Sequence, residues 1–176
     1  MTPFPLWRSD RNTKILISTF LASMLVAIGV AELNNYDKVW RARDGVVQRY
    51  GPEKEVDPDA PLQPGDLVAR MNTFSTLLDV THPHVFEIPL VLFVLAHFLM
   101  RCRTPEWLKL GSYLASFLGA LFFIASPWLV RYVSPRGAVF FHLGSALIGL
   151  SALVMIVVPL WEMWWMPPPD DGGYPG

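Results

Sequence analysis

The sequence of 176 residues has one cysteine and four histidines. A single cysteine, Cys102, excludes an intrachain disulfide, and the lack of a CxxCH motif excludes covalent attachment of a c-type haem. The sequence also has no phosphate-binding glycine loop, no zinc-protease motif and no nucleophile elbow, and its basic residues form no nucleic-acid patch. These absences argue against a free-standing hydrolase and against a nucleic-acid partner.

Charged residues are scarce, at 16% of the chain, whereas 52% of the residues are hydrophobic. The hydrophobic residues gather in four blocks: Ile15 to Ala31, Val85 to Met100, Trp107 to Val130 and Ala138 to Trp165. At about 1.5 Å of rise per residue, each block can cross a hydrocarbon core of about 30 Å as a helix, the first two only just. The runs are continuous and do not alternate as the strands of a membrane β-barrel must. The sequence therefore predicts an all-α membrane protein with four transmembrane helices in a bundle.

Lysine and arginine near the block ends predict the orientation of this bundle. Three of these residues precede the first block, three lie in the turn after the second block or in the first residues of the third, and two lie between the third and fourth: Arg8, Arg11, Lys14, Arg101, Arg103, Lys109, Arg131 and Arg136. Cytoplasmic flanks carry the excess of positive charge, so both termini are expected in the cytoplasm. We expect a multi-pass protein of the cell inner (cytoplasmic) membrane, with the first block kept as a signal anchor rather than cleaved as a signal peptide.

This topology divides the chain into four parts. They are a cytoplasmic N-terminus with the signal-anchor helix (1–31), a long extracytoplasmic loop (32–81), a three-helix membrane portion (82–165) and a cytoplasmic tail (166–176). Within the loop, the spacing of apolar residues predicts two amphipathic helices, Tyr36 to Tyr50 and Leu67 to Val80. The proline-rich acidic stretch between them is typical of a linker.

The histidines lie in the apolar blocks or at their mouths, where a polar and titratable side chain is costly. Pro83 suits the first turn of a helix. We therefore expect Thr81 or His82 to cap the second membrane helix and His84 to begin it. Glu87 then lies one turn deeper on nearly the same face.

His142 lies about five residues into the last block, which enters the membrane from the same surface as His84. Two neutral imidazoles from neighbouring helices can supply both axial ligands of a b-type haem, so His84 with His142 is the predicted pair. His82 can substitute for either, and Glu87 can orient a ligand or exchange a proton with a quinone. The same cluster also fits copper or zinc, which stays open as an alternative.

His97 follows His84 by thirteen residues, about 20 Å further along a helix and rotated by about 220°. These two histidines therefore cannot share a metal. As a haem ligand, His97 would need a partner such as Met100, Met163 or a residue of another subunit. A histidine that only hydrogen-bonds carbonyls, headgroups or water is the competing interpretation at each position, and at His97 it is the stronger one.

With His84, His142 and His97 as the matching residues, the bundle resembles the small four-helix membrane cytochrome b-type subunits of respiratory chains over residues 82–165. It departs from the pattern in which one helix carries two histidines on one face for two haems, so the resemblance implies one haem b. It further implies an electron-transfer subunit that relays electrons between quinone and an extracytoplasmic redox partner, and a subunit of a redox complex more than an enzyme alone.

Two alternatives to electron transfer stay open. One is a non-catalytic accessory subunit of a larger respiratory or photosynthetic membrane complex, whose loop docks on other membrane subunits. The other is a membrane protein that handles copper or zinc. In each case the lipid bilayer surrounds the helices, and the redox partner or docking partner is another protein.

Overall fold

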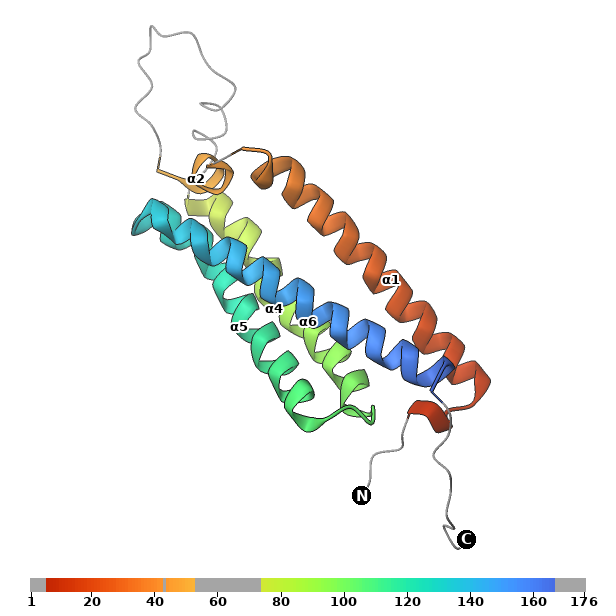
Figure 1. The fold of residues 1–176 in the computed structure, drawn as a ribbon. Coiled ribbons are helices and arrows are strands. Elements are labelled where there is room, and N and C mark those ends of the chain that lie inside the picture. Colours follow the sequence, from red (N-terminus) through yellow and green to blue (C-terminus); the bar gives the residue numbers. More distant parts are fainter. Residues whose placement is uncertain (1–5, 43, 53–73, 167–176) are drawn as a thin grey trace, which may run out of the picture.

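The chain is helical, as its composition predicts. The computed structural model describes residues 6–42, 44–52 and 74–166. The elements are η1 (Leu6–Arg8), α1 (Arg11–Asn35), η2 (Tyr36–Trp40), α2 (Gly45–Tyr50), α4 (Phe74–Met100), α5 (Glu106–Tyr132), η3 (Pro135–Gly137) and α6 (Ala138–Trp164) (Figure 1). By length and composition, four helices can cross a membrane, and these are α1 with η2, α4, α5, and η3 with α6. The predicted all-α fold with four transmembrane helices is confirmed.

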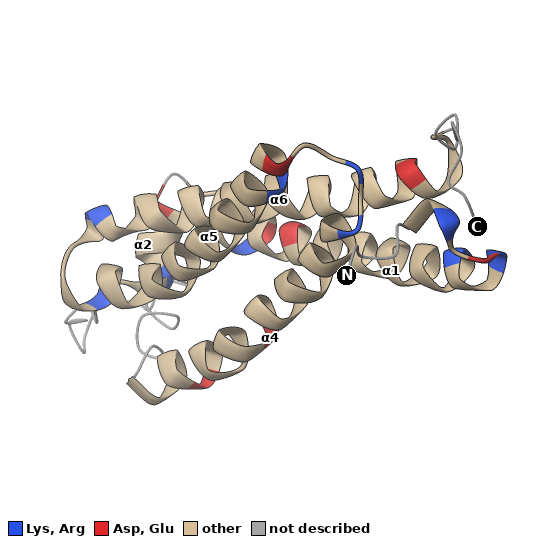
Figure 2. Cartoon of the chain, turned by 90° about the horizontal axis from the view of Figure 1, so that it is seen from below, with Lys and Arg blue, Asp and Glu red and all other residues tan. Residues whose placement is uncertain are grey.

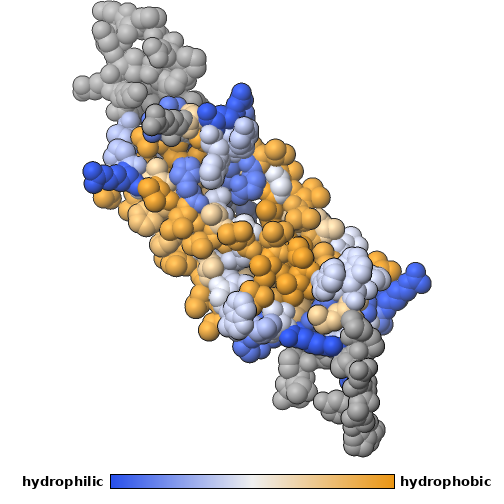
Figure 3. Space-filling model, in the orientation of Figure 1, coloured by the Kyte–Doolittle hydropathy of each residue, from blue (hydrophilic) through white to orange (hydrophobic). Residues whose placement is uncertain are grey.

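The surface of the bundle is that of a membrane protein. Apolar residues form a band across the middle of the molecule, and hydrophilic residues gather toward its two ends (Figure 3). Lysine and arginine residues lie at helix ends and in the turns between helices (Figure 2). This distribution is expected where the helices face hydrocarbon and their ends reach water.

Helix α4 begins earlier than the sequence suggested. The expectation that Thr81 or His82 caps this helix and that His84 begins it is wrong, because α4 runs without a break from Phe74 to Met100 and contains Pro83. Proline removes one backbone donor, and membrane helices tolerate this loss where neighbouring groups bond the freed carbonyls. His84 therefore lies about 15 Å along α4 from Phe74, well past the first turn of the helix.

Helix α1 is also longer than its apolar block, because its ends are set by polar groups. The Asp10 carboxylate caps the first turn by accepting bonds from the backbone N–H groups of Asn12 and Thr13. The single amphipathic helix expected from Tyr36 to Tyr50 is wrong: the π-helical η2 continues α1, and the separate short helix α2 follows. Of the second predicted loop helix, residues 74–80 are the first turns of α4 and residues 67–73 lie outside the described residues.

The α5–α6 pair packs most extensively and forms the centre of the bundle. Two glycines permit this close approach, Gly119 of α5 and Gly144 of α6. A Cβ added to Gly144 would lie 2.6 Å from the Phe123 amide nitrogen and 2.7 Å from the Gly119 carbonyl oxygen. Small residues at such crossings let membrane helices come together and gain dispersion energy.

One end of the bundle, called here the capped end, is covered by η2 and α2. Val39 of η2 and Val46 of α2 are buried against Val130 of α5 and Phe141 of α6. The cap itself is tight, because a Cβ on Gly45 would lie 2.0 Å from the Val39 carbonyl oxygen. These contacts hold the polar residues of the cap against the helix ends.

At the opposite end, the first and last helices are tied by side chains. Lys14 of α1 donates from Nζ to the Met163 carbonyl oxygen of α6 (2.9 Å), and Trp164 Nε1 donates to Ser18 Oγ (2.8 Å). The Leu6 side chain of η1 is buried in the same apolar cluster as Met163. The described ends of the chain, residues 6 and 166, thus lie at the same end of the bundle (Figure 1).

Candidate functional site

Beneath the cap lies a cavity of about 230 Å³ at the junction of η2, α2 and the long helices. We call it the capped cavity. Its lining comes from every long helix and from both cap elements: Asn34, Asn35, Lys38, Val39, Arg49, Tyr50, Val80, Thr81, His84, Phe123, Ile124, Pro127 and Phe141. Because so many elements meet there, its shape depends on the whole fold.

The capped cavity is amphipathic. The end of α1 contributes two side-chain amides, and the cap contributes the Tyr50 phenol and two cations, Lys38 and Arg49. The α5 side contributes apolar surface from Phe123, Ile124 and Pro127. Arg49 Nε donates to the Tyr50 hydroxyl (3.3 Å), which orients both groups. A small ring with polar substituents and an apolar body matches this lining, since ligand cavities combine apolar walls with a few placed polar groups.

His84 is the titratable side chain that α4 contributes to the capped cavity. Its Nδ1 lies 2.6 Å from the Val80 carbonyl oxygen of the preceding turn. A carbonyl can only accept, so Nδ1 carries the proton, and Nε2 of the neutral ring is left as an acceptor or a metal ligand. Nearby, Trp128 Nε1 donates to Thr81 Oγ1 (2.9 Å), which ties α4 to α5 beside the cavity.

His142, the other member of the predicted haem pair, lines a different cavity. That cavity, of about 260 Å³, lies among α2, η3 and the start of α6 and is lined by His142 and Arg136 but not by His84. The His142 ring meets the Trp40 ring edge to face, with centroids 4.7 Å apart, and its buried Nδ1 has no hydrogen-bond partner in the part of the chain that the structure describes. No described cavity is lined by both histidines, and the pair stays a prediction.

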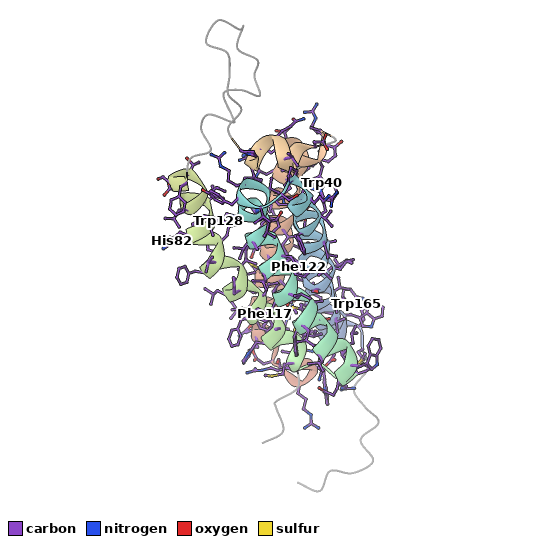
Figure 4. The ribbon with its side chains drawn as sticks, turned by 90° about the vertical axis from the view of Figure 1, so that its left-hand side faces the viewer. Trp40, His82, Phe117, Phe122, Trp128 and Trp165 are labelled. Atoms are coloured by element: carbon purple, nitrogen blue, oxygen red, sulfur yellow. The ribbon has the colours of Figure 1, made fainter. Side chains whose placement is uncertain are left out.

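The remaining predicted site residues, His82, Glu87 and His97, are exposed on α4. His82 contacts the Phe86 ring and His97 contacts the Phe93 ring, each on its own helix. His82 projects away from the bundle (Figure 4). Among residues 6–42, 44–52 and 74–166, no group of three His, Cys, Asp or Glu side chains is placed to hold a metal ion. The structure thus brings His84 to the capped cavity and leaves these three residues outside it.

Comparison with known proteins identifies the family of this chain. The family model Aq_1264_TM, described as a transmembrane helical domain, matches residues 44–170, which include α2, α4, α5 and α6. The chain belongs to this family. No curated protein and no solved structure matches it. Membership shows a helical membrane protein, a coarser statement than the resemblance to cytochrome b-type subunits.

The cap residues that line the capped cavity were not predicted as site residues from the sequence. Asn34, Asn35 and Lys38 are ordinary polar residues at the end of an apolar block. The signal that pointed toward them was the run of aromatic and charged residues from Tyr36 to Tyr50, which indicated a surface segment but not the cavity beneath it. They line the capped cavity together with His84 because the end of α1 and η2 lie beside α4 at this end of the bundle.

A second polar cluster, at the end opposite the cap, was also not predicted from the sequence. Glu162 of α6 is 1% exposed; its Oε2 accepts the Arg103 backbone N–H (2.6 Å), and its Oε1 has no partner within the described ranges. Burial, together with the Glu162 carboxylate, raises the pKa of the nearby Cys102 thiol to about 12, against a smaller opposing effect of Lys109. Cys102 is therefore a protonated, inert thiol.

Proposed function

We propose that this protein is an electron-transfer subunit of a bacterial-type inner membrane and that the capped cavity binds the head of a membrane quinone. The capped end then faces the extracytoplasmic side and both termini face the cytoplasm, as the basic flanks favour. An extracytoplasmic redox protein would accept the electrons above the cap. A quinol bound in the cavity would supply two electrons and two protons on oxidation.

The observation that carries the proposal is the fixed ring of His84 in an amphipathic cavity at the membrane boundary. With Nδ1–H held by the Val80 carbonyl, the neutral ring offers Nε2 as an acceptor for a hydroxyl of the quinol form. The same nitrogen can take up the proton that leaves when this hydroxyl is oxidised. Lys38 and Arg49 are cationic side chains that can donate hydrogen bonds, so they suit a carbonyl oxygen or a developing negative charge.

The chain's residues fit a quinone better than a haem held by two histidines. The bond from His84 Nδ1 to a carbonyl is the arrangement found for metal-ligating histidines, so one of the two histidine ligands that a haem would need is available. The second is not, because His142 lines the other cavity and the capped cavity has no further histidine in its lining. Haem b with His84 and His142 as ligands remains the alternative, and copper or zinc has less support because no described three-residue group could hold the ion.

The test is titration of the purified protein in nanodiscs with a short-chain ubiquinol and with the matching ubiquinone, followed by tryptophan fluorescence. His84→Leu should weaken ubiquinol binding about tenfold, the equivalent of one hydrogen bond of about 1.4 kcal/mol. His82→Leu is the matched control, because His82 lies two residues away on the same helix, is exposed and does not line the cavity. Equal affinities of the two variants would exclude the capped cavity as the site.

An optical spectrum separates the quinone proposal from the haem alternative. A reduced-minus-oxidised b-haem band in the purified protein that is lost in both His84→Ala and His142→Ala would establish the pair predicted from the sequence. The proposal expects quinol binding by protein that shows no such band.

A further inference from the structure

Helix α4 has one face in the bundle and another that nothing in the described chain covers. Leu92, Leu95 and Leu99 are buried against the other helices. On the opposite side, Phe86, Leu90 and Phe93 recur at spacings of four and three residues and are 65%, 63% and 56% exposed. This spacing places them in one stripe along the helix, which we call the α4 outer face.

The α4 outer face carries ionisable residues as well as apolar ones. His82 and His97 lie on the stripe, and their rings contact those of Phe86 and Phe93 at steep interplanar angles. Glu87 lies at the edge of the stripe, and all three residues are exposed. No hydrogen bond or ion pair joins Glu87 to any other residue of the described chain. A face built only to meet lipid would have no such groups.

The depth of these groups makes contact with lipid alone unfavourable. Thr81 Oγ1 accepts a hydrogen bond from Trp128, near the capped end of α5, and because tryptophan is enriched at membrane interfaces we take Thr81 as the reference for the boundary. At about 1.5 Å per residue, Glu87 lies about 9 Å deeper than Thr81 and His97 about 24 Å deeper. Both therefore fall within a hydrocarbon core of about 30 Å, where an ionisable side chain normally faces protein and has a partner.

We infer that the α4 outer face docks a transmembrane helix of another subunit, which places an arginine, lysine or hydroxyl donor opposite Glu87. Phe86 and Phe93 supply the apolar surface on either side of this polar contact. A second, symmetrically related copy of this chain fits less well, because a parallel two-fold interface sets the two Glu87 carboxylates at equal depth with no donor between them. The inference does not depend on quinone binding, which involves the other side of α4 and can be measured on the isolated protein.

Photo-crosslinking in native membranes tests this inference. A photoreactive amino acid is placed at Phe86 or Phe93 of α4 and, as the control, at Leu114 or Leu121 of α5, which are 63% and 62% exposed. We expect a protein adduct of one defined mass from the α4 positions and lipid adducts only from the α5 positions. Mass spectrometry of the adduct should place the crosslink on an apolar helix with an Arg, Lys, Ser, Thr or Tyr within one turn.

A charge-specific variant adds a second readout. Glu87→Leu should lower the adduct yield at Phe93 about tenfold through loss of a buried polar contact, whereas Val85→Leu, also exposed on α4, should leave the yield unchanged. Leucine favours membrane insertion, so Glu87→Leu is expected to insert as the parent chain does, and an unchanged circular dichroism spectrum of the variant shows that it has folded. An adduct of two copies of this chain, lipid adducts alone at the α4 positions, a crosslinked helix without a donor, or an unchanged yield in Glu87→Leu would each overturn the inference.

Discussion

Replacing Gly144 with alanine should force the two central helices apart. The new Cβ would lie 2.6 Å from the Phe123 nitrogen and 2.7 Å from the Gly119 oxygen, whereas ordinary contact begins at 3.4 Å. Both neighbours are backbone atoms, so no change of rotamer relieves the overlap, and α5 and α6 must separate locally. Overpacking of this kind costs about 1–3 kcal/mol of the free energy of unfolding. The gain in helix propensity from glycine to alanine, up to about 1 kcal/mol, opposes part of that loss.

Gly149→Ala on the same helix isolates the propensity contribution, because a Cβ at Gly149 meets nothing within 4 Å. The difference between the two variants should therefore be about 1–3 kcal/mol, with Gly144→Ala the less stable. Reversible denaturation by SDS in mixed micelles, followed by circular dichroism, measures this difference. Phe123 also lines the capped cavity, so Gly144→Ala should weaken ubiquinol binding too, while Gly149→Ala should not. Equal stability of the two variants would refute the assigned helix contact.

Two further predictions concern the end opposite the cap. Glu162→Leu leaves the partly buried Arg103 backbone N–H without its acceptor and should destabilise the protein by about 1–3 kcal/mol, more than Glu162→Gln, which keeps an acceptor. Equal losses of thermal stability in both variants would contradict this. The pKa of Cys102, raised from 9.0 to about 12, should slow iodoacetamide labelling at pH 8 in the folded protein by about three orders of magnitude relative to the SDS-unfolded chain. Because the folded pKa is the higher one, the associated stability is fully present below pH 9 and is lost as the pH rises toward about 12. Equally fast labelling of folded and unfolded protein would show that Cys102 is accessible.

The existence of the four membrane helices could be predicted because length and hydropathy alone decide whether a segment spans a bilayer. Their ends could not, because helix ends depend on caps and packing. Asp10 extends α1 beyond its apolar block, and α4 continues through Pro83, a residue that in a soluble protein usually marks a first turn. His84 and Glu87 therefore lie in the interior of α4, whereas the sequence placed them in its first two turns.

The candidate site was only partly predictable from the sequence. A residue's position along a helix can be counted, but which neighbouring helix its side chain faces depends on how the helices pack. His142 directly follows Phe141, which lines the capped cavity, and one residue turns an α-helix by about 100°. That turn takes His142 to the other cavity. Helix α6 is apolar on nearly all sides, so no polar face in the sequence marked which of its residues would meet α4. The packing of η2 and α2 on the bundle, which adds Lys38 and Arg49 to the cavity lined by His84, likewise depends on contacts distant in sequence.

The bond between Lys14 and the Met163 carbonyl also has a consequence for biogenesis. The two residues are 149 positions apart, so at about 5–20 residues per second α1 leaves the ribosome roughly 7–30 s before its anchor exists. Until then the helix made first has no docking site on α6, whereas α5 and α6, joined by a short turn, pair as soon as the second of them is synthesised. In the newborn chain α1 is therefore not yet tied to α6, and synthesis of the last turn of α6 completes that tie.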